Sequence, residues 1–220
     1  MKKYYQLNTK KDIVKGIGKN YFKYNIEYIK KTQKLVYSII IGKYDKISAF
    51  NKQEGYKYFL FSDIKYNKAN WTIISITKLI KKVNTSNLKM TRYFKLFPHL
   101  FFKDYELSIY IDASYIIHGD FNELLLKTLN PSFDIYFLQH QVRNKVFKEF
   151  SPVLKIKKDT QASVNKVKER YMKEKFPDNL GLTVNCIIIR KHNQKNIIKL
   201  SLLKRFYIKY STFISYFFII

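Results

Sequence analysis

The chain has 220 residues, of which 46% are hydrophobic, so it is long and apolar enough for one folded domain with a short appendage and not for wholesale disorder. Its formal net charge is +26, but the lysines are spread along the whole chain, within a composition rich in the residues that A/T-rich codons specify. We therefore expect no specific nucleic-acid partner, only a general attraction to polyanions or anionic lipid headgroups.

The first elements in chain order are a leader and three strands. Residues 1–33 predict a basic leader, and the segment from Met1 to Lys11, polar and basic with no long apolar core, is not expected to be a signal peptide. Near-continuous apolar runs then predict strands at 35–41, 56–61 and 71–76. A helical spacing follows over 90–102, which Pro98 breaks or kinks.

The second half continues the alternation of strands and helices. Strands are predicted at 107–111, 133–138 and 186–189, and helices at 120–129, 144–176 and 196–209. Asp120 is a good N-cap, with Glu123 three residues later as in a capping box. This order predicts an α/β fold with a central, mainly parallel sheet flanked by helices.

The carboxyl ends of three predicted strands carry an aspartate, namely Asp45, Asp63 and Asp112. Sheets of this kind bind ligands outside the carboxyl ends of their strands. The chain has only six glycines and neither a GxGxxG nor a Walker-type loop, so a metal or basic side chains would have to hold any phosphate group.

The strongest local signal is the run IYIDAS at 109–114, in which an apolar strand delivers Asp112 to the edge of the sheet. Residues i and i+2 of a strand point the same way, so Asp112 and Ser114 could share one divalent cation. The alternative is that Asp112 only caps the end of the strand or a turn.

Two further groups are candidate ligand contacts. Arg92 and Lys95 lie on one helix face and His99 a turn further, where they could hold phosphate or form a solvated basic face. His140 and Arg143 follow the fifth strand, and a His in that position is more often packed or capping. Asn185 precedes the sixth strand. Its neighbour Cys186 is the one cysteine of the chain and is expected in the core. A single cysteine allows no disulfide within the chain, which fits a reducing compartment.

Several runs, taken in order, resemble a glycosyltransferase-like family first described as a domain of unknown function, which includes plant proteins linked to turgor regulation and seed mucilage. The matching runs are VYSIIIGKYD (36–45), YFLFSD (58–63), RYFKLFPH (92–99), SIYIDAS (108–114), GDFNEL (119–124), HQVR (140–143), GL (181–182) and IRKHN (189–193).

The resemblance implies a GT-A-like transferase that uses a nucleotide-sugar donor and a glycan or lipid-linked acceptor. It implies Mn²⁺ or Mg²⁺ held by an Asp-x-Asp pair, and the chain departs from that pattern because Ser114 stands in place of the second aspartate, so that Asp112 and Ser114 would hold the metal. The donor nucleotide would be bound by Tyr37, Gly42, Tyr44, Asp63, Arg92, Lys95 and Asp112, and the sugar or acceptor would face His140, Arg143 and Asn185. No residue is assigned as a catalytic base.

The chain departs from the family pattern after the last predicted helix. The family usually ends in a Ser-Arg-Arg-Asp-Gln-type segment, where this chain has YSTFISY at 210–216 and an apolar end. We therefore divide the chain into a leader (1–33), a glycosyltransferase-like domain (34–195) and a terminal helix with an atypical apolar tail (196–220). The departure predicts a truncated carboxyl terminus, which would impair transfer.

Two hypotheses follow for the function. The first is a cytoplasmic glycosyltransferase of the polysaccharide-forming type, with peripheral membrane contact as an option. The rival is a non-catalytic protein, basic and aromatic, that binds polyanions or a membrane surface. The apolar tail is shorter than the roughly 20 residues that a spanning helix needs, so it is not expected to cross a bilayer unaided.

Overall fold

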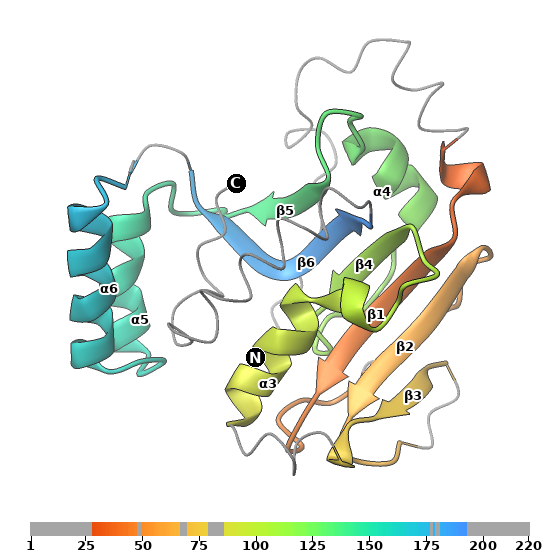
Figure 1. Cartoon of the computed structure of the whole chain (residues 1–220), viewed down its shortest axis with the longest axis horizontal. Coiled ribbons are helices and arrows are strands. Elements are labelled where there is room, and N and C mark those ends of the chain that lie inside the picture. The colour runs from red at the N-terminus through yellow and green to blue at the C-terminus, as the bar shows by residue number, and fades with distance from the viewer. Residues whose placement is uncertain are drawn as a thin grey trace.

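The structure is a computed structural model that describes residues 28–47, 50–66, 70–78, 86–176, 178 and 181–192. Its centre is a six-stranded sheet in the order β3-β2-β1-β4-β6-β5 (Figure 1). The strands are β1 (Lys34–Ile40), β2 (Tyr56–Ser62), β3 (Thr72–Ser75), β4 (Leu107–Ile111), β5 (Ile135–Gln139) and β6 (Thr183–Lys191).

The predicted mainly parallel α/β fold is confirmed. β1 pairs in parallel with β2 and with β4, β2 pairs in parallel with β3, and β6 runs antiparallel to both β4 and β5. The chain winds from β1 toward β3 on one side and resumes with β4 on the other side of β1. The boundary between β1 and β4 is therefore the switch point at which open α/β sheets bind ligands.

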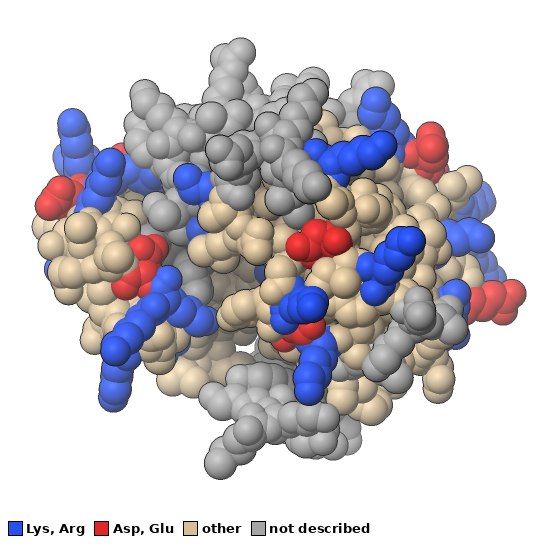
Figure 2. All heavy atoms as spheres, turned by 90° about the horizontal axis from the view of Figure 1, so that it is seen from below, with Lys and Arg blue, Asp and Glu red and all other residues tan. Residues whose placement is uncertain are grey.

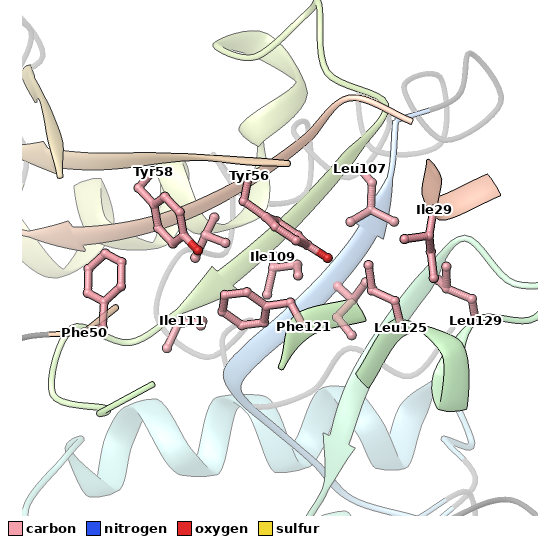
Figure 3. Packing of buried hydrophobic residues seen from close by; sticks show 12 residues of the cluster. Ile29, Phe50, Tyr56, Tyr58, Leu107, Ile109, Ile111, Phe121, Leu125 and Leu129 are labelled. Atoms are coloured by element: carbon pink, nitrogen blue, oxygen red, sulfur yellow. The ribbon is translucent and has the colours of Figure 1, made fainter. Parts of the chain in front are cut away.

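Two helices cover opposite faces of this sheet. Every residue of β1 and β4 is buried, as expected for strands covered on both faces. On one face, Phe121 and Leu125 of α4 (Phe121–Thr128) pack in a cluster with Val36 and Ile109, which Figure 3 shows from close by. On the other face, α3 (Asn87–Leu96) buries Phe94 against β1 and β2.

The helix predicted at 90–102 is shorter and begins earlier. Ser86 caps α3, its hydroxyl accepting a hydrogen bond from Lys89 N at 3.3 Å. The helix ends at Leu96, and Pro98 opens a separate 3₁₀ turn over Pro98–Leu100, because proline cannot donate the next helical hydrogen bond. The helix predicted at 120–129 is confirmed as α4, and its N-cap is Asp120, which accepts from Asn122 N at 2.7 Å.

The single helix predicted over 144–176 is wrong. The segment forms a 3₁₀ turn (Val146–Glu149), α5 (Phe150–Lys155) and α6 (Gln161–Lys173), and α5 and α6 form a hairpin beside the sheet (Figure 1). The break has two local causes: Lys157 takes a left-handed φ of 53°, and Thr160 caps α6 by accepting from Ser163 N at 3.2 Å. Val153, Val164 and their neighbours give the hairpin a hydrophobic cluster of its own.

The predicted leader to residue 27, the helix at 196–209 and the tail at 210–220 lie outside the described residues. Within the described ranges, no helix is both long enough and apolar enough to cross a membrane.

Candidate functional site

The carboxyl ends of β1, β2 and β4 meet at one edge of the sheet, because these strands run in parallel. Asp45, Asp63 and Asp112 follow the three strands, so the predicted gathering of aspartates at this edge is present. Figure 2 looks onto the side of the molecule toward which β1 and β2 point in Figure 1, and there acidic side chains lie among surrounding Lys and Arg side chains.

Gly42 and Asp63 form the first contact of this edge. The amide of Gly42 donates to both carboxylate oxygens of Asp63, at 3.1 Å each. Gly42 has a φ of 72°, in the left-handed region, and a β-carbon at this position would collide with the side-chain amide of Asn87. Glycine thus lets the chain turn sharply after β1 and aim its amide at Asp63.

Gly42→Ala should therefore lower the free energy of unfolding by roughly 1–2 kcal/mol, because a side chain is forced into left-handed backbone. Equilibrium urea unfolding measures the change. Gly119→Ala is the matched control, since Gly119 has no heavy atom within 4 Å of an added β-carbon and an ordinary φ. Equal losses in the two variants would contradict this account of Gly42.

A second contact joins Lys95 of α3 to Asp112. Lys95 Nζ lies 3.0 Å from Asp112 Oδ1 and 4.4 Å from the centroid of the Tyr110 ring. The Tyr110 hydroxyl donates to the same Oδ1 atom. The Lys95 side chain is 12% exposed and that of Asp112 is 34% exposed, so the pair stands at the rim of the core with the carboxylate toward solvent.

The end of α3 is fixed by two side chains from the sheet. Tyr37 donates its hydroxyl to the Lys95 carbonyl at 3.0 Å, and Arg190 Nη1 donates to the Leu96 carbonyl at 2.9 Å. A cation at a helix carboxyl terminus is favoured by the helix dipole, although burial lowers the pKa of Arg190. These contacts hold Lys95 where its ammonium group reaches Asp112.

Tyr37 supports the site and does not line it, contrary to the prediction. It is 1% exposed, burial raises its pKa, and its ring packs against Tyr110 and Phe102. Tyr44 is the opposite case: it stands 89% exposed at the carboxyl edge and could contact a ligand there.

Arg92 and His99 do not form a solvated face with Lys95. Arg92 is 6% and His99 5% exposed, so the inner side of the helix and of the following 3₁₀ turn buries them in the fold. Lys95, the third basic residue of this group, places its ammonium group 3.0 Å from Asp112 at the edge of the sheet.

The alternation that linked Asp112 to Ser114 does not apply. β4 ends at Ile111, and the Tyr115 amide donates to the Asp112 carbonyl at 3.0 Å, which closes a turn over these four residues. Ser114 is exposed within this turn. Strand geometry therefore gives no support to a cation shared by the two side chains.

Cys186 of β6, which was expected in the core, lies opposite Asp112, where the antiparallel β4–β6 ladder continues past Ile111 and Ile187. Phe137 pairs with Ile188 and the next residue, Leu138, pairs with Val184, so residues 185–187 bulge from the ladder with β5. The carbonyl of Cys186 in this bulge accepts the Asp112 amide at 2.9 Å. Burial raises the pKa of the Cys186 thiol, which a hydrogen bond with Tyr115 opposes and the charge of Asp112 reinforces.

Asn185 precedes Cys186 in the same bulge and is 8% exposed. It was predicted to face the sugar or acceptor together with His140 and Arg143. The antiparallel register of β6 against β4 brings Asn185 to the side of the sheet where β4 ends, and no local pattern in the sequence reveals that register.

His140 and Arg143 are brought together, as predicted. His140 Nδ1 accepts from the amides of Val142 and Arg143 at 3.1 and 3.0 Å, and Arg143 Nε forms an ion pair with buried Glu149. Burial lowers the pKa of His140, Arg143 lowers it further, and Glu149 opposes the shift. The prediction missed Glu149, which ties this loop to the helical hairpin.

A divalent cation at this edge would find an incomplete set of protein ligands. Both contacts of Asp112 fall on Oδ1, which leaves Oδ2 without a hydrogen bond from the described residues. Asp45 is a second carboxylate nearby: burial raises its pKa, and so does the charge of Asp112. Among the described residues, no group of three His, Cys, Asp or Glu could hold a metal ion. The described residues therefore do not by themselves supply the set of oxygen ligands that a divalent cation needs.

Comparisons of the chain with family models, with curated proteins and with solved structures found no match. A function is inferred instead from the carboxyl edge of the sheet: from its place in the topology, from its aspartates and from the Lys95–Asp112 pair.

Proposed function

We propose that the chain is a glycosyltransferase that takes a sugar from a nucleotide-sugar donor to a glycan or lipid-linked acceptor. The observation that carries the proposal is the position of Asp112. It follows β4 at the switch point next to β1, where α/β sheets bind nucleotides, and shares this edge with Asp45 and Asp63.

The contacts of the edge give each residue a role under this proposal. Gly42 and Asp63 form a fixed turn against which the base and ribose would lie, with exposed Tyr44 beside it. Asp112, with Mn²⁺ or Mg²⁺ where one is bound, and Lys95 would meet the diphosphate. His140, Arg143 and Asn185 would face the sugar or the acceptor, and the protein would work in the cytoplasm or at a membrane surface.

Thermal unfolding in the presence of nucleotides tests the proposal. UDP and GDP, each with Mn²⁺, should stabilise the protein by about 2.7 kcal/mol at a concentration of about 100 times Kd. For a chain of this size, that corresponds to a rise in Tm of about 5–10 °C. Hydrolysis of a panel of nucleotide sugars would then identify the donor.

The rival hypothesis, a basic binding protein, predicts a different outcome. No nucleoside diphosphate would raise Tm, and binding to a polyanion such as heparin would weaken steeply as salt is added. That result would refute the transferase proposal.

A further inference from the structure

We propose that His140 and Arg143 form an oxyanion subsite, which binds a carboxylate or phosphate group of the acceptor. The inference rests on the proposed function and deepens it, because it names the chemical class of the acceptor as one that carries a negative charge. It also makes Glu149 a positioning residue, which holds Arg143 in place for that group.

The hydrogen bonds of the His140 ring determine which of its nitrogens carries a proton. Nδ1 accepts from the backbone amides of Val142 and Arg143, at 3.1 and 3.0 Å. A ring nitrogen that accepts hydrogen bonds carries no proton, so the proton of the neutral ring is on Nε2. Burial, and then the charge of Arg143, lower the pKa of His140, which favours the neutral ring, although Glu149 opposes the shift. Nε2 is therefore an N–H donor.

This donor faces a second donor. Arg143 Nη2 lies 2.9 Å from His140 Nε2, and a guanidinium group can only donate hydrogen bonds. The nearest carboxylate is that of Glu149, whose Oε2 atom lies 3.9 Å from Nε2, beyond hydrogen-bonding distance. Within the described part of the chain, no oxygen accepts a hydrogen bond from Nε2. The two N–H donors thus lie side by side, an arrangement that a ligand oxygen accepting from both would stabilise.

Glu149 fixes Arg143 without using all of its donors. The Glu149 carboxylate, in a side chain that is 9% exposed, forms an ion pair with Arg143 Nε. The side chains of Arg143 and His140 are 27% and 14% exposed, so the pair is partly open to solvent. A guanidinium group held in this way can bind a carboxylate or phosphate group through its remaining N–H donors, with little further loss of side-chain entropy.

The sheet topology places this pair at the edge that carries Asp112. β4 and β5 both run antiparallel to β6, so their carboxyl ends lie on one side of the sheet. His140 directly follows β5, and its amide donates to the Leu182 carbonyl at 2.7 Å. Two strand spacings, roughly 10 Å, separate β5 from β4. This separation favours a group of the acceptor over the donor diphosphate, which would lie beside Lys95.

Nuclear magnetic resonance of the histidine ring nitrogens tests the inference on the protein without ligand. The chain has four histidines, so a long-range ¹H–¹⁵N spectrum separates their rings, and His140→Gln assigns the signals of His140. His140 should show the tautomer with its proton on Nε2. A proton on Nδ1 would overturn the inference, because Nε2 would then accept from Arg143 and need no ligand.

Titration with small oxyanions, at neutral pH and constant ionic strength, measures the subsite in the same spectrum. Glucuronate represents an acidic glycan, dimethylallyl phosphate represents a lipid-linked acceptor, and glucose is the neutral control. At least one of the two oxyanions should shift the His140 signals to saturation, and the tighter binder shows whether the group is a carboxylate or a phosphate. Glucose should cause no shift. If neither oxyanion shifted these signals, the inference would be wrong.

Two variants of the ion pair should change the oxyanion affinity in opposite directions. Arg143→Gln should weaken binding at least about tenfold, because the forked cation is lost. Glu149→Gln should strengthen binding about threefold, because a nearby negative charge is removed while the amide oxygen can still accept from Arg143 Nε. Arg170→Gln and Glu174→Gln are the matched controls, since they make the same changes in an Arg–Glu pair on α6, and they should leave the affinity unchanged.

A purely structural ion pair would give a different result. If it only tied the loop to the helical hairpin, Arg143→Gln and Glu149→Gln would both bind the oxyanion as wild type does, and the inference would be overturned. Failure of the proposed function is distinguishable. If UDP or GDP raises Tm but no oxyanion binds, this inference alone fails. If an oxyanion binds at His140 but no nucleotide does, the transferase proposal fails, and the assignment of the subsite to an acceptor fails with it.

Discussion

Phe94→Ala is expected to lower the free energy of unfolding by about 3–5 kcal/mol, the largest stability effect that we predict. Phe94 is 0% exposed and stacks on Phe61 with ring centroids 4.4 Å apart, which fastens α3 to β2. Truncation removes the buried ring and leaves a cavity between helix and sheet. Because Lys95 is the next residue, the loss should also loosen the Lys95–Asp112 pair.

The control for this variant lies in the same helix. Leu88 is 54% exposed, so Leu88→Ala should change stability by no more than about 0.5 kcal/mol. Urea unfolding at equilibrium gives both values. If Phe94→Ala were as mild as Leu88→Ala, α3 would not be anchored to the sheet in the way described.

Elements that bury both faces could be predicted well from the sequence. β4 has the predicted bounds, and β1 differs from its prediction by one residue at each end, because a continuous apolar run of strand length is typical of a strand covered on both faces. α4 was placed by Asp120, whose capping side chain acts over two residues and needs no tertiary partner. Signals of this kind are local, so they can be recognised in the sequence without knowledge of the fold.

Features that depend on pairing register or on competing local signals could not be predicted. The break between α5 and α6 comes from a left-handed lysine and a threonine cap inside a segment with helical periodicity throughout. Cys186 meets Asp112 because β6 pairs antiparallel with β4 in a register that sets Ile187 opposite Ile111, and the bulge against β5 is likewise a matter of register. The spacing of the basic residues likewise did not indicate that Arg92 is buried whereas Lys95 contacts Asp112 at the edge of the sheet.

The candidate site could be predicted at the level of strand ends. Gly42, Asp63 and Asp112 follow parallel strands, so topology alone brings them to one edge. Their partners could not be predicted, because these arise where α3 crosses the sheet: Lys95 reaches Asp112 and Tyr37 reaches the end of the helix. The polar contacts around Asp112 are therefore a product of packing between elements distant in the sequence.

Asp112→Asn should weaken binding of a nucleoside diphosphate in the presence of Mn²⁺ at least tenfold, roughly 1.4 kcal/mol. The asparagine keeps the size of the side chain and can still accept the Tyr110 hydroxyl, but it loses the charge that a metal requires. With a chelator in place of Mn²⁺, Asp112→Asn should bind the nucleotide no more weakly than wild type. The neutral asparagine no longer forms an ion pair with Lys95, so the Lys95 ammonium group is free to contact phosphate.

The control for Asp112→Asn is a second aspartate that loses its charge without losing its structural role. Asp120→Asn serves this purpose, since Asn caps a helix such as α4 as well as Asp does. Isothermal titration calorimetry of both variants and of wild type, each with Mn²⁺ and with chelator, gives the affinities to be compared. A tenfold loss in Asp112→Asn that persists in chelator would mean that Asp112 contacts the nucleotide without a metal. If Asp112→Asn instead bound the nucleotide as tightly as wild type in the presence of Mn²⁺, Asp112 would not hold a metal for it.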